Sequence, residues 1–284
     1  MTYRKLLVPL NGTERDNQVL TAAFEIAKPC KAHVMGIYVR PDPAEVLPYL
    51  GEGISASVIQ EIMDAARASA GRSAAAARSS LDQFAKKYAA PTMDSSGLSA
   101  SFCLRDGPAD LVVSDEARLS DLVVFPLPGP SGHANLRQMI ETTLLNGRSP
   151  VLLVPATHKA VYGAKAVIGW DGGSTAARTV AAAIPMLKAA SAIEILSVSS
   201  GSIETAEMDR LRDYLRLYGL SATEHGINPG GQNIGAALLD AASRAEAGVL
   251  VLGGYGHSRW RELVLGGVTR HVLSEATLPI FMAH

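Results

Sequence analysis

Short apolar runs alternate with longer segments of helical periodicity along the chain. In the first part of the chain, the apolar runs predict strands over residues 4–10, 32–39, 99–104, 121–125 and 150–154. The segments between them, with apolar residues three and four positions apart, predict helices over residues 16–27, 56–90, 108–118 and 137–145. Strands that alternate with helices indicate a parallel sheet with helices on both faces, joined by right-handed crossovers.

The same order of elements begins again after residue 163. Strands are predicted over residues 165–170, 192–198, 222–227, 248–252 and 278–283. Helices are predicted over residues 176–188, 204–218 and 234–245, and from Gly267 onward. The two sets match element for element, so we infer an internal duplication with its joint near residues 157–163. This predicts an N-terminal domain over residues 1–157 and a C-terminal domain over residues 163–284.

The predicted helix over residues 56–90 is unusually long. It is rich in Ala and Ser, and its apolar residues form one stripe. At about 1.5 Å per residue, an unbroken helix here runs to roughly 50 Å, which is longer than a small domain. The helix therefore either bends near Gly71–Ser73 or projects from its domain. We expect a packed amphipathic helix rather than a surface for a partner helix.

Composition and charge exclude several classes of protein. The chain of 284 residues is 48% hydrophobic and carries a formal net charge of −1 with no basic stripe, so nucleic acid is not expected as a partner. No apolar run approaches the ~20 residues that span a bilayer, and the N-terminus lacks the apolar region of a signal peptide. Cys30 and Cys103 lack metal-binding or redox spacing. We therefore expect a cytoplasmic protein that does not contact a membrane.

A glycine-rich loop follows the apolar run 249–252. Gly253 is followed by Gly256 after two residues and by Gly266 after nine more, and a helix is predicted to begin near Gly267. Glycines let the backbone approach an anion closely, and the N–H groups of a helix N-terminus attract negative charge. The pattern therefore predicts a phosphate-binding loop, although glycines after a strand also occur as simple turn residues.

Side chains near this loop carry additional hydrogen-bond donors, and they are His257, Arg259 and Thr269. The loop lacks the Gly-Lys-Ser/Thr ending of a Walker A motif, and it is not a Rossmann fingerprint. His257 either contacts phosphate, senses pH near neutrality or simply lies exposed on the loop, and exposure is the reading that we favour for it.

The strand over residues 165–170 ends in Asp171-Gly172. In an open α/β sheet, ligands bind at the carboxyl ends of the strands where the strand order reverses, and this strand and the strand before Gly253 flank that point. We therefore expect Asp171 and the glycines of the loop to line one crevice. The alternative role for Asp171 is a cap for the following helix.

The glycine motif and its surroundings resemble the nucleotide-binding signature of universal stress proteins. The resemblance rests on Gly-x2-Gly-x9-Gly after an apolar strand and before a helix that ends in Pro-apolar-apolar, and on the segment from Gly254 to Leu273. It implies an adenine nucleotide alpha hydrolase-like fold: two tandem, open, five-stranded parallel sheets in the order 3-2-1-4-5, paired through their last strands. It further implies bound ATP or AMP, with Mg²⁺ as an accompanying ion.

The resemblance assigns the nucleotide to the C-terminal domain. Asp171 is implied near the adenosine or metal end of the nucleotide, and the glycine loop near the ribose and phosphates. The implied binding residues are Asp171, Gly172, Gly253, Gly256, His257, Arg259, Gly266, Gly267, Val268 and Thr269. This chain departs from the family at Gly267, where Ser or Thr is usual, so one side-chain phosphate donor is missing.

The N-terminal domain lacks an equivalent loop. It keeps Asn11-Gly12-Thr13 after its first strand, but prolines fill the loop after Phe125, where the family has glycines. Proline has no N–H and a fixed φ, so this loop cannot present the same row of donors. We predict that the N-terminal domain does not bind ATP in the family's manner. His133 and Arg137 either hold another anion or are solvated loop residues.

Three functions fit these features. The first is a universal stress protein that binds an adenine nucleotide in its C-terminal domain and acts in stress response or signalling through conformation or choice of partner. The second is a slow ATPase or phosphotransferase, for which Asp171 and His257 are the only candidate groups, so at most weak hydrolysis is expected. The third is a nucleotide-free dimerisation scaffold. The two domains either satisfy the dimer interface within one chain or pair again in a homodimer.

Overall fold

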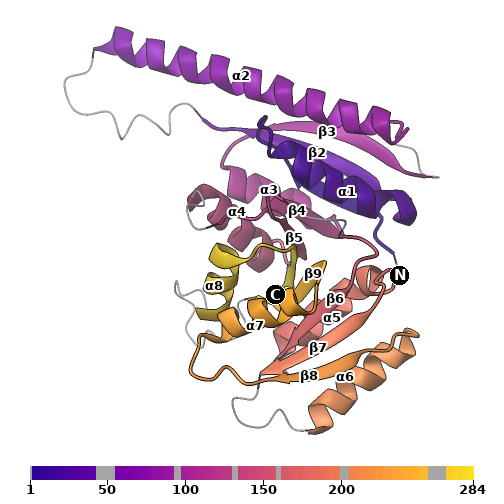
Figure 1. Cartoon of the computed structure of the whole chain (residues 1–284). Helices are drawn as coiled ribbons and strands as arrows, with labels where there is room; N and C mark the ends of the chain where they lie inside the picture. The colour runs from indigo at the N-terminus through magenta and orange to yellow at the C-terminus, as the bar shows by residue number, and fades with distance from the viewer. Residues whose placement is uncertain are drawn as a thin grey trace.

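The computed structural model describes residues 2–42, 55–92, 97–129, 134–157, 161–198, 205–254 and 267–284. Within these residues the chain forms a 10-stranded sheet with helices on both faces (Figure 1). The α/β class that the sequence predicts is confirmed. Strands and helices alternate as predicted, and only the ends of the elements differ by a few residues.

The first part of the chain, here called the N-terminal half, supplies the strands β1 (Lys5–Pro9), β2 (His33–Arg40), β3 (Ser99–Asp106), β4 (Leu122–Pro126) and β5 (Val151–Val154). Its helices are α1 (Asp16–Cys30), α2 (Ala56–Lys87), α3 (Ala109–Ala117) and α4 (Ala134–Leu145). The second part, the C-terminal half, repeats this order. Its strands are β6 (Ala166–Trp170), β7 (Ile193–Val198), β8 (Thr223–Ile227), β9 (Val249–Gly253) and β10 (Ile280–Ala283). Its helices are α5 (Ser174–Leu187), α6 (Thr205–Leu217), α7 (Ile234–Arg244) and α8 (Gly267–Glu275).

The strands lie side by side in the order β3-β2-β1-β4-β5-β10-β9-β6-β7-β8. Strands are parallel within each half, while β5 and β10 pair antiparallel with Phe281 opposite Leu152. Each half has the strand order 3-2-1-4-5 that the resemblance implies, and the pairing of the last strands, β5 and β10, joins the two five-stranded sheets into one continuous sheet. β5 and β10 are buried throughout, so each would otherwise leave a row of unpaired backbone groups away from water.

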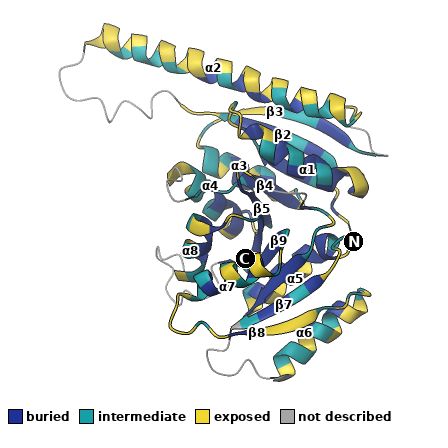
Figure 2. Ribbon diagram, in the orientation of Figure 1, coloured by how far each residue is buried: buried dark blue, intermediate teal, exposed yellow. Residues whose placement is uncertain are grey.

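Alternate residues of the central strands face two separate cores. Leu6 and Val8 of β1 belong to the core that α1, α2, α5 and α6 cover, whereas Leu7 belongs to the core under α3, α4, α7 and α8. All three side chains are fully buried. Strands that are buried on both faces are typical of a parallel sheet covered by helices. Figure 2 shows the same layering, with buried strands inside and exposed residues on the outer sides of the helices.

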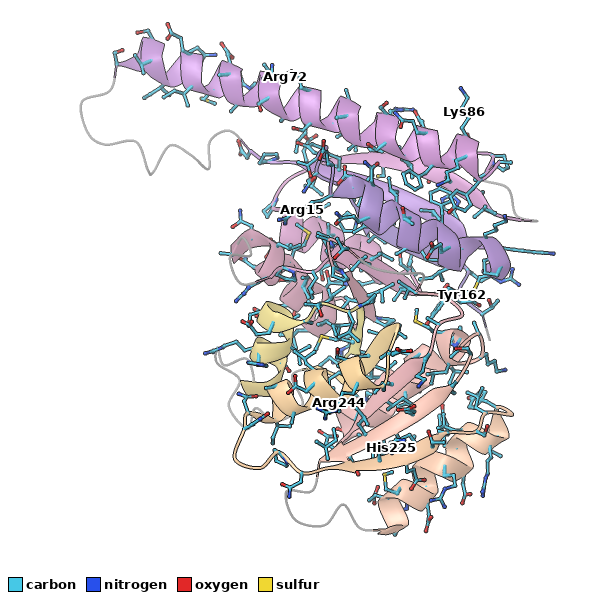
Figure 3. The ribbon with its side chains drawn as sticks, viewed as in Figure 1. Arg15, Arg72, Lys86, Tyr162, His225 and Arg244 are labelled. Carbon is cyan, nitrogen blue, oxygen red and sulfur yellow. The ribbon has the colours of Figure 1, made fainter. Side chains whose placement is uncertain are left out.

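α2 is an unbroken helix of 32 residues, about 48 Å long. Its first half is largely exposed and extends beyond the sheet, and farther along Lys86 points away from the sheet (Figure 1, Figure 3). Its buried residues begin only in the middle of the helix and are Ala70, Ala74, Ala77 and Leu81. Of the two predicted alternatives, the helix projects from its domain and does not bend, since it continues unbroken through Gly71. Neither α2 nor any other helix in the described ranges is long and apolar enough to cross a membrane.

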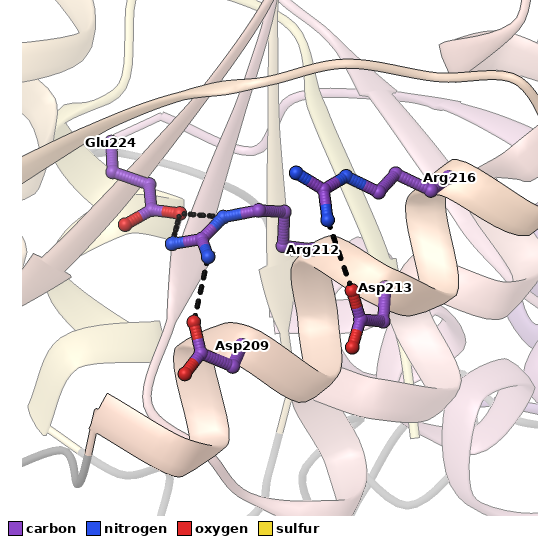
Figure 4. A network of polar contacts seen from close by, with 5 residues as sticks. All are labelled: Asp209, Arg212, Asp213, Arg216 and Glu224. Carbon is purple, nitrogen blue, oxygen red and sulfur yellow. Dashed lines mark hydrogen bonds and ion pairs between the residues drawn. The ribbon is translucent and has the colours of Figure 1, made fainter.

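Charged side chains connect the outer strand β8 to α6 (Figure 4). Arg212 of α6 donates from Nε and Nη2 to Oε1 of Glu224 in β8, at 2.9 and 2.7 Å, and from Nη1 to Asp209 at 2.6 Å. Arg216 pairs with Asp213 at 3.2 Å. Exposed pairs of this kind stabilise a fold by only about 0–1 kcal/mol. On an outer strand they have a second effect, because charged side chains discourage the sheet edge from pairing with other chains.

Candidate functional site

The predicted crevice lies where β6 and β9 are neighbours. The two strands are parallel, and Gly169 is in register with Leu252. Their carboxyl ends therefore meet at the same edge of the sheet, with Asp171 and Gly172 following β6 and Gly253 closing β9. The loop of residues 255–266 lies outside the described residues, and with it the candidates Gly256, His257, Arg259 and Gly266.

Asp171 shapes the turn that leads into α5. Its Oδ1 accepts a hydrogen bond from the backbone N–H of Gly173 at 2.8 Å, and the side chain as a whole is exposed. Gly172 has a φ of +74°, a conformation that favours glycine. Gly173 occupies the N-cap position and makes no side-chain cap bond, so Asp171 acts on the turn before the helix and not as its N-cap residue. The carboxylate is thus held in place at the carboxyl end of β6.

Gly253 is needed for close packing. A Cβ at this position would lie 2.8 Å from the backbone nitrogen of Ala176 and 3.1 Å from its Cα. The end of β9 therefore rests directly on the first turn of α5, and any side chain here would push these two elements apart. The spacing of the glycines gives no sign of this contact, which is tertiary. A bulky substitution at Gly253 would disturb packing as well as any ligand.

The N-terminus of α8 is open at its first residue. Gly267 is exposed, and no atom of the described residues lies within 4 Å of a Cβ placed on it. Val268 is half-buried, and its carbonyl oxygen lies against Gly235 of α7. Thr269 is 5% exposed and shares the buried face of the helix with Val272 and Leu273. Of the candidates on α8, Gly267 therefore has space for a ligand or a side chain, while Thr269 is packed within the fold.

Trp170 is a polar group at this edge that the sequence analysis missed. The residue ends β6 directly before Asp171 and is 7% exposed. Its indole N–H is buried and has no hydrogen-bond partner among the described residues. Buried donors are almost always paired, so an unpaired one calls for an explanation. A tryptophan at the end of a strand, next to a candidate ligand-binding acid, is the sequence signal that points to it.

The equivalent turn of the N-terminal half satisfies its own polar groups. Asp16 is buried and accepts from the backbone N–H groups of Asn11 at 3.0 Å and Gly12 at 2.8 Å. The side chain of Asn11 accepts from the N–H and the hydroxyl of Thr13, at 3.0 and 2.6 Å. Burial raises the pKa of the Asp16 carboxyl, and the two backbone hydrogen bonds act in the opposite direction. The donors of this turn are thus used internally.

The two turns also differ in what packs over them. Gly12 has a φ of +76°, and a Cβ on it would lie 2.3 Å from the carbonyl oxygen of Ser73 in α2. At the equivalent Gly172, the nearest atom to such a Cβ is Cγ of Glu207 in α6, at 3.9 Å. The long helix therefore lies directly on the N-terminal turn, while the shorter α6 makes only an ordinary side-chain contact.

Arg137 is folded onto its own loop. Its Nη2 donates to the carbonyl oxygen of Gly129 at 3.0 Å, and its buried Nε has no hydrogen-bond partner within the part of the chain that the structure describes. The residue is half-buried, so the expectation of a solvated side chain is wrong for Arg137. The short hydrogen bond to the loop backbone is the reason. His133, its predicted companion, lies outside the described residues.

The described residues contain no cluster of three or more His, Cys, Asp or Glu side chains that could hold a metal ion. No protein-family model matches the chain, and no curated protein matches it.

The fold is similar to several solved structures. A universal stress protein from Archaeoglobus fulgidus DSM 4304 gives a TM-score of 0.65 at 16% identity, over 98% of this chain and 95% of that chain. A protein from Pseudomonas aeruginosa UCBPP-PA14 that is assigned to the universal stress proteins gives a TM-score of 0.62 at 15% identity, over 99% of this chain and 93% of that chain. A protein of unknown function from Pseudomonas aeruginosa PAO1 gives a TM-score of 0.60 at 15% identity, over 99% of this chain and 92% of that chain. The chain therefore has the fold of the universal stress proteins over its whole length.

Proposed function

We propose that the C-terminal half binds an adenine nucleotide, ATP or AMP, and that binding alters the conformation or the partners of the protein in stress response or signalling. The observation that carries this proposal is the register of β6 and β9, which brings Asp171-Gly172 and Gly253 to one edge of the sheet. Ligands of open α/β sheets bind at this kind of edge. The glycine motif that continues from Gly253 is the part of the chain that resembles universal stress proteins.

The residues at this edge fit such a ligand. The first turn of α8 has backbone N–H groups without helical partners, which attract phosphate, and the space around Gly267 leaves room for one. Asp171 is exposed and carries a carboxylate suited to ribose hydroxyls or to a Mg²⁺ ion on the nucleotide. Phosphate and sugar would thus each have a complementary group.

The N-terminal half is proposed to serve a different role. Its turn uses its own donors, α2 lies over Gly12, and Arg137 is bonded to its loop. These features leave no counterpart of the open edge beside Gly172. We therefore expect one nucleotide for each chain.

Replacing Asp171 with Asn is expected to weaken nucleotide binding by about tenfold or more, because hydrogen bonds to a charged group are worth about 1.5–3 kcal/mol. Asn keeps an oxygen for the Gly173 N–H, so the turn is preserved. Isothermal titration calorimetry with ATP and with AMP, in the presence of Mg²⁺, measures the change. The matched control is Asn11→Asp, which makes the reciprocal change in the other half and should leave the affinity unaltered.

Two results would contradict the proposal: no binding by the unaltered protein at millimolar nucleotide, or equal affinity before and after Asp171→Asn. Phosphate release from ATP, measured in parallel, tests the slow ATPase alternative. Release that disappears in Asp171→Asn would support turnover, and release that persists would indicate a contaminating enzyme.

Replacing Gly267 with Ser is expected to tighten nucleotide binding by about two- to tenfold, the value of one added neutral hydrogen bond. The position is exposed and free of contacts, so the hydroxyl is accommodated without strain. The control is Gly71→Ser, at another helical glycine that has no atom within 4 Å of the new Cβ. An affinity that rises equally in both variants, or in neither, would remove the N-terminus of α8 from the proposed site.

A further inference from the structure

A polar hollow lies on the α7 side of the C-terminal half. It has a volume of about 480 Å³, and its polar lining includes Lys165, Glu194, His225, Asn228 and Arg244. Figure 3 labels two of these residues, His225 on β8 and Arg244 on α7. Lys165 directly precedes β6 and Asp171 directly follows it, so the two lie about 20 Å apart at roughly 3.3 Å per residue. The hollow is therefore separate from the proposed nucleotide site.

Glu194 organises the charges of this hollow. Its Oε1 accepts from Nζ of Lys165 at 2.8 Å, and its Oε2 lies 3.9 Å from Nε2 of His225. The Glu194 side chain is only 16% exposed, so its contacts are shielded from water more than those of a surface pair. Lys165 is consequently held at the edge of the hollow and does not move freely in solvent.

Arg244 adds a second positive charge to the hollow. It is the last residue of α7, and its side chain has no ion pair or hydrogen bond with any other residue in the described ranges. With His225 neutral, Lys165 and Arg244 outnumber Glu194 by one charge. A guanidinium and an ammonium that face one hollow are the donors that bind carboxylate and phosphate oxygens.

The N-terminal half has an apolar residue at the place of Glu194, as the strand registers show. Leu6 of β1 pairs with Val34, just as Ala166 of β6 pairs with Ile193, so Met35 and Glu194 are equivalent. Met35 packs against the apolar core on the α3 and α4 side. The fold therefore does not need a carboxylate at this point of the sheet.

The remaining positions follow from the same comparison. Ile37 pairs with Cys103 in β3 and Leu196 pairs with His225 in β8, so Cys103 and His225 are equivalent. α3 is two residues shorter than α7, and counted from the N-caps Pro108 and Asn233 its last residue, Ala117, corresponds to Ala242, with both side chains fully buried in the same core. Lys5, the first residue of β1, corresponds to Lys165 before β6, and Arg105 and Glu116, which pair at 3.1 Å, lie near Cys103. The carboxylate that holds the lysine is thus a property of the C-terminal half.

We propose that this hollow binds a small metabolite through an oxyanion, either a carboxylate or a phosphate ester. Arg244 and Lys165 donate to the oxyanion, Glu194 holds Lys165 in place, and Asn228 and His225 supply further polar contacts around the ligand. The volume lies within the range of small-molecule sites, about 300–1,000 Å³. The ligand is bound independently of the proposed nucleotide, because the two sites lie at opposite ends of β6.

The test is an NMR titration of the full-length ¹⁵N-labelled protein with inorganic phosphate and, separately, with malonate, at constant ionic strength set with chloride. Saturable shifts are expected for the backbone N–H groups of Gly226, Asn228 and Ala245. Arg244→Gln is expected to weaken this binding by about tenfold. Arg244 is exposed and unpaired within the described residues, so its substitution should leave the fold unchanged.

A matched pair of lysine variants separates a binding site from general charge attraction. Lys165→Gln should also weaken binding, whereas Lys5→Gln, the equivalent change in the N-terminal half, should not. Saturation by phosphate alone identifies a phosphate ester as the ligand class, and saturation by malonate alone identifies a carboxylate. The proposal is overturned if shifts do not saturate, if all variants respond alike, or if the shifts centre on residues 171–173 and not on the hollow.

Discussion

Replacing Gly12 with Ala is expected to lower the free energy of unfolding by about 4 kcal/mol. Its φ of +76° costs a residue with a Cβ about 1–2 kcal/mol, and forced overpacking adds about 1–3 kcal/mol. The overpacking arises because the new Cβ would lie 2.3 Å from the carbonyl oxygen of Ser73. That atom belongs to the backbone of α2, so it cannot move without shifting the helix. Urea denaturation followed by circular dichroism measures the loss.

The matched control for this experiment is Gly172→Ala in the C-terminal half. Its φ of +74° is nearly the same, but the nearest atom to the new Cβ is a side-chain carbon at 3.9 Å. This variant should therefore lose only the backbone term, about 1–2 kcal/mol. Equal losses in the two variants would show that α2 does not rest on the N-terminal turn in solution.

Replacing Phe281 with Ala is expected to lower the free energy of unfolding by about 3–5 kcal/mol, the usual loss for a buried phenylalanine. Phe281 is fully buried at the centre of β10, opposite Leu152 of β5. The cavity would open where the two halves join, so neither half could close it alone. The same denaturation experiment measures the effect. Leu217→Ala, at a side chain that is 83% exposed, should change stability by less than about 0.5 kcal/mol.

A loss below about 1 kcal/mol in Phe281→Ala would contradict the described packing at the seam between the halves. It would mean that β10 is not held against β5 in the way that the register with Leu152 requires.

The strand and helix order was within reach of the sequence because short apolar runs and helical periodicity differ clearly. The continuity of α2 was not, because Gly71 suggested a break while the alanines around it favour an unbroken helix. Nothing packs against Gly71, so no tertiary contact imposes the bend. The first half of the helix is exposed because it extends past the edge of the sheet, and the position of that edge cannot be predicted from hydrophobic periodicity.

The candidate site was predictable only as far as topology determines it. The rule for open sheets was enough to bring Asp171 and Gly253 to one edge. This rule could not predict two contacts, because each joins segments that lie far apart in the chain. They are the contact of Gly253 with α5 and the contact of Ser73 in α2 with the N-terminal turn. The charged hollow was missed for the same reason, since only the strand registers unite Lys165 with Arg244.

The antiparallel pairing of β5 with β10 has a consequence for biosynthesis. β10 begins 126 residues after β5 ends, since Ile280 follows Val154 at that distance. At about 5–20 residues per second, the ribosome needs roughly 6–25 s to supply the partner strand. During that interval the apolar β5 is the uncovered edge of a nascent sheet, which is a template for a strand of another chain. Chains on neighbouring ribosomes of one message therefore compete with each chain's own β10 for pairing with β5. Slow translation of the C-terminal half favours a misfolded product in which two chains exchange this strand and form a dimer.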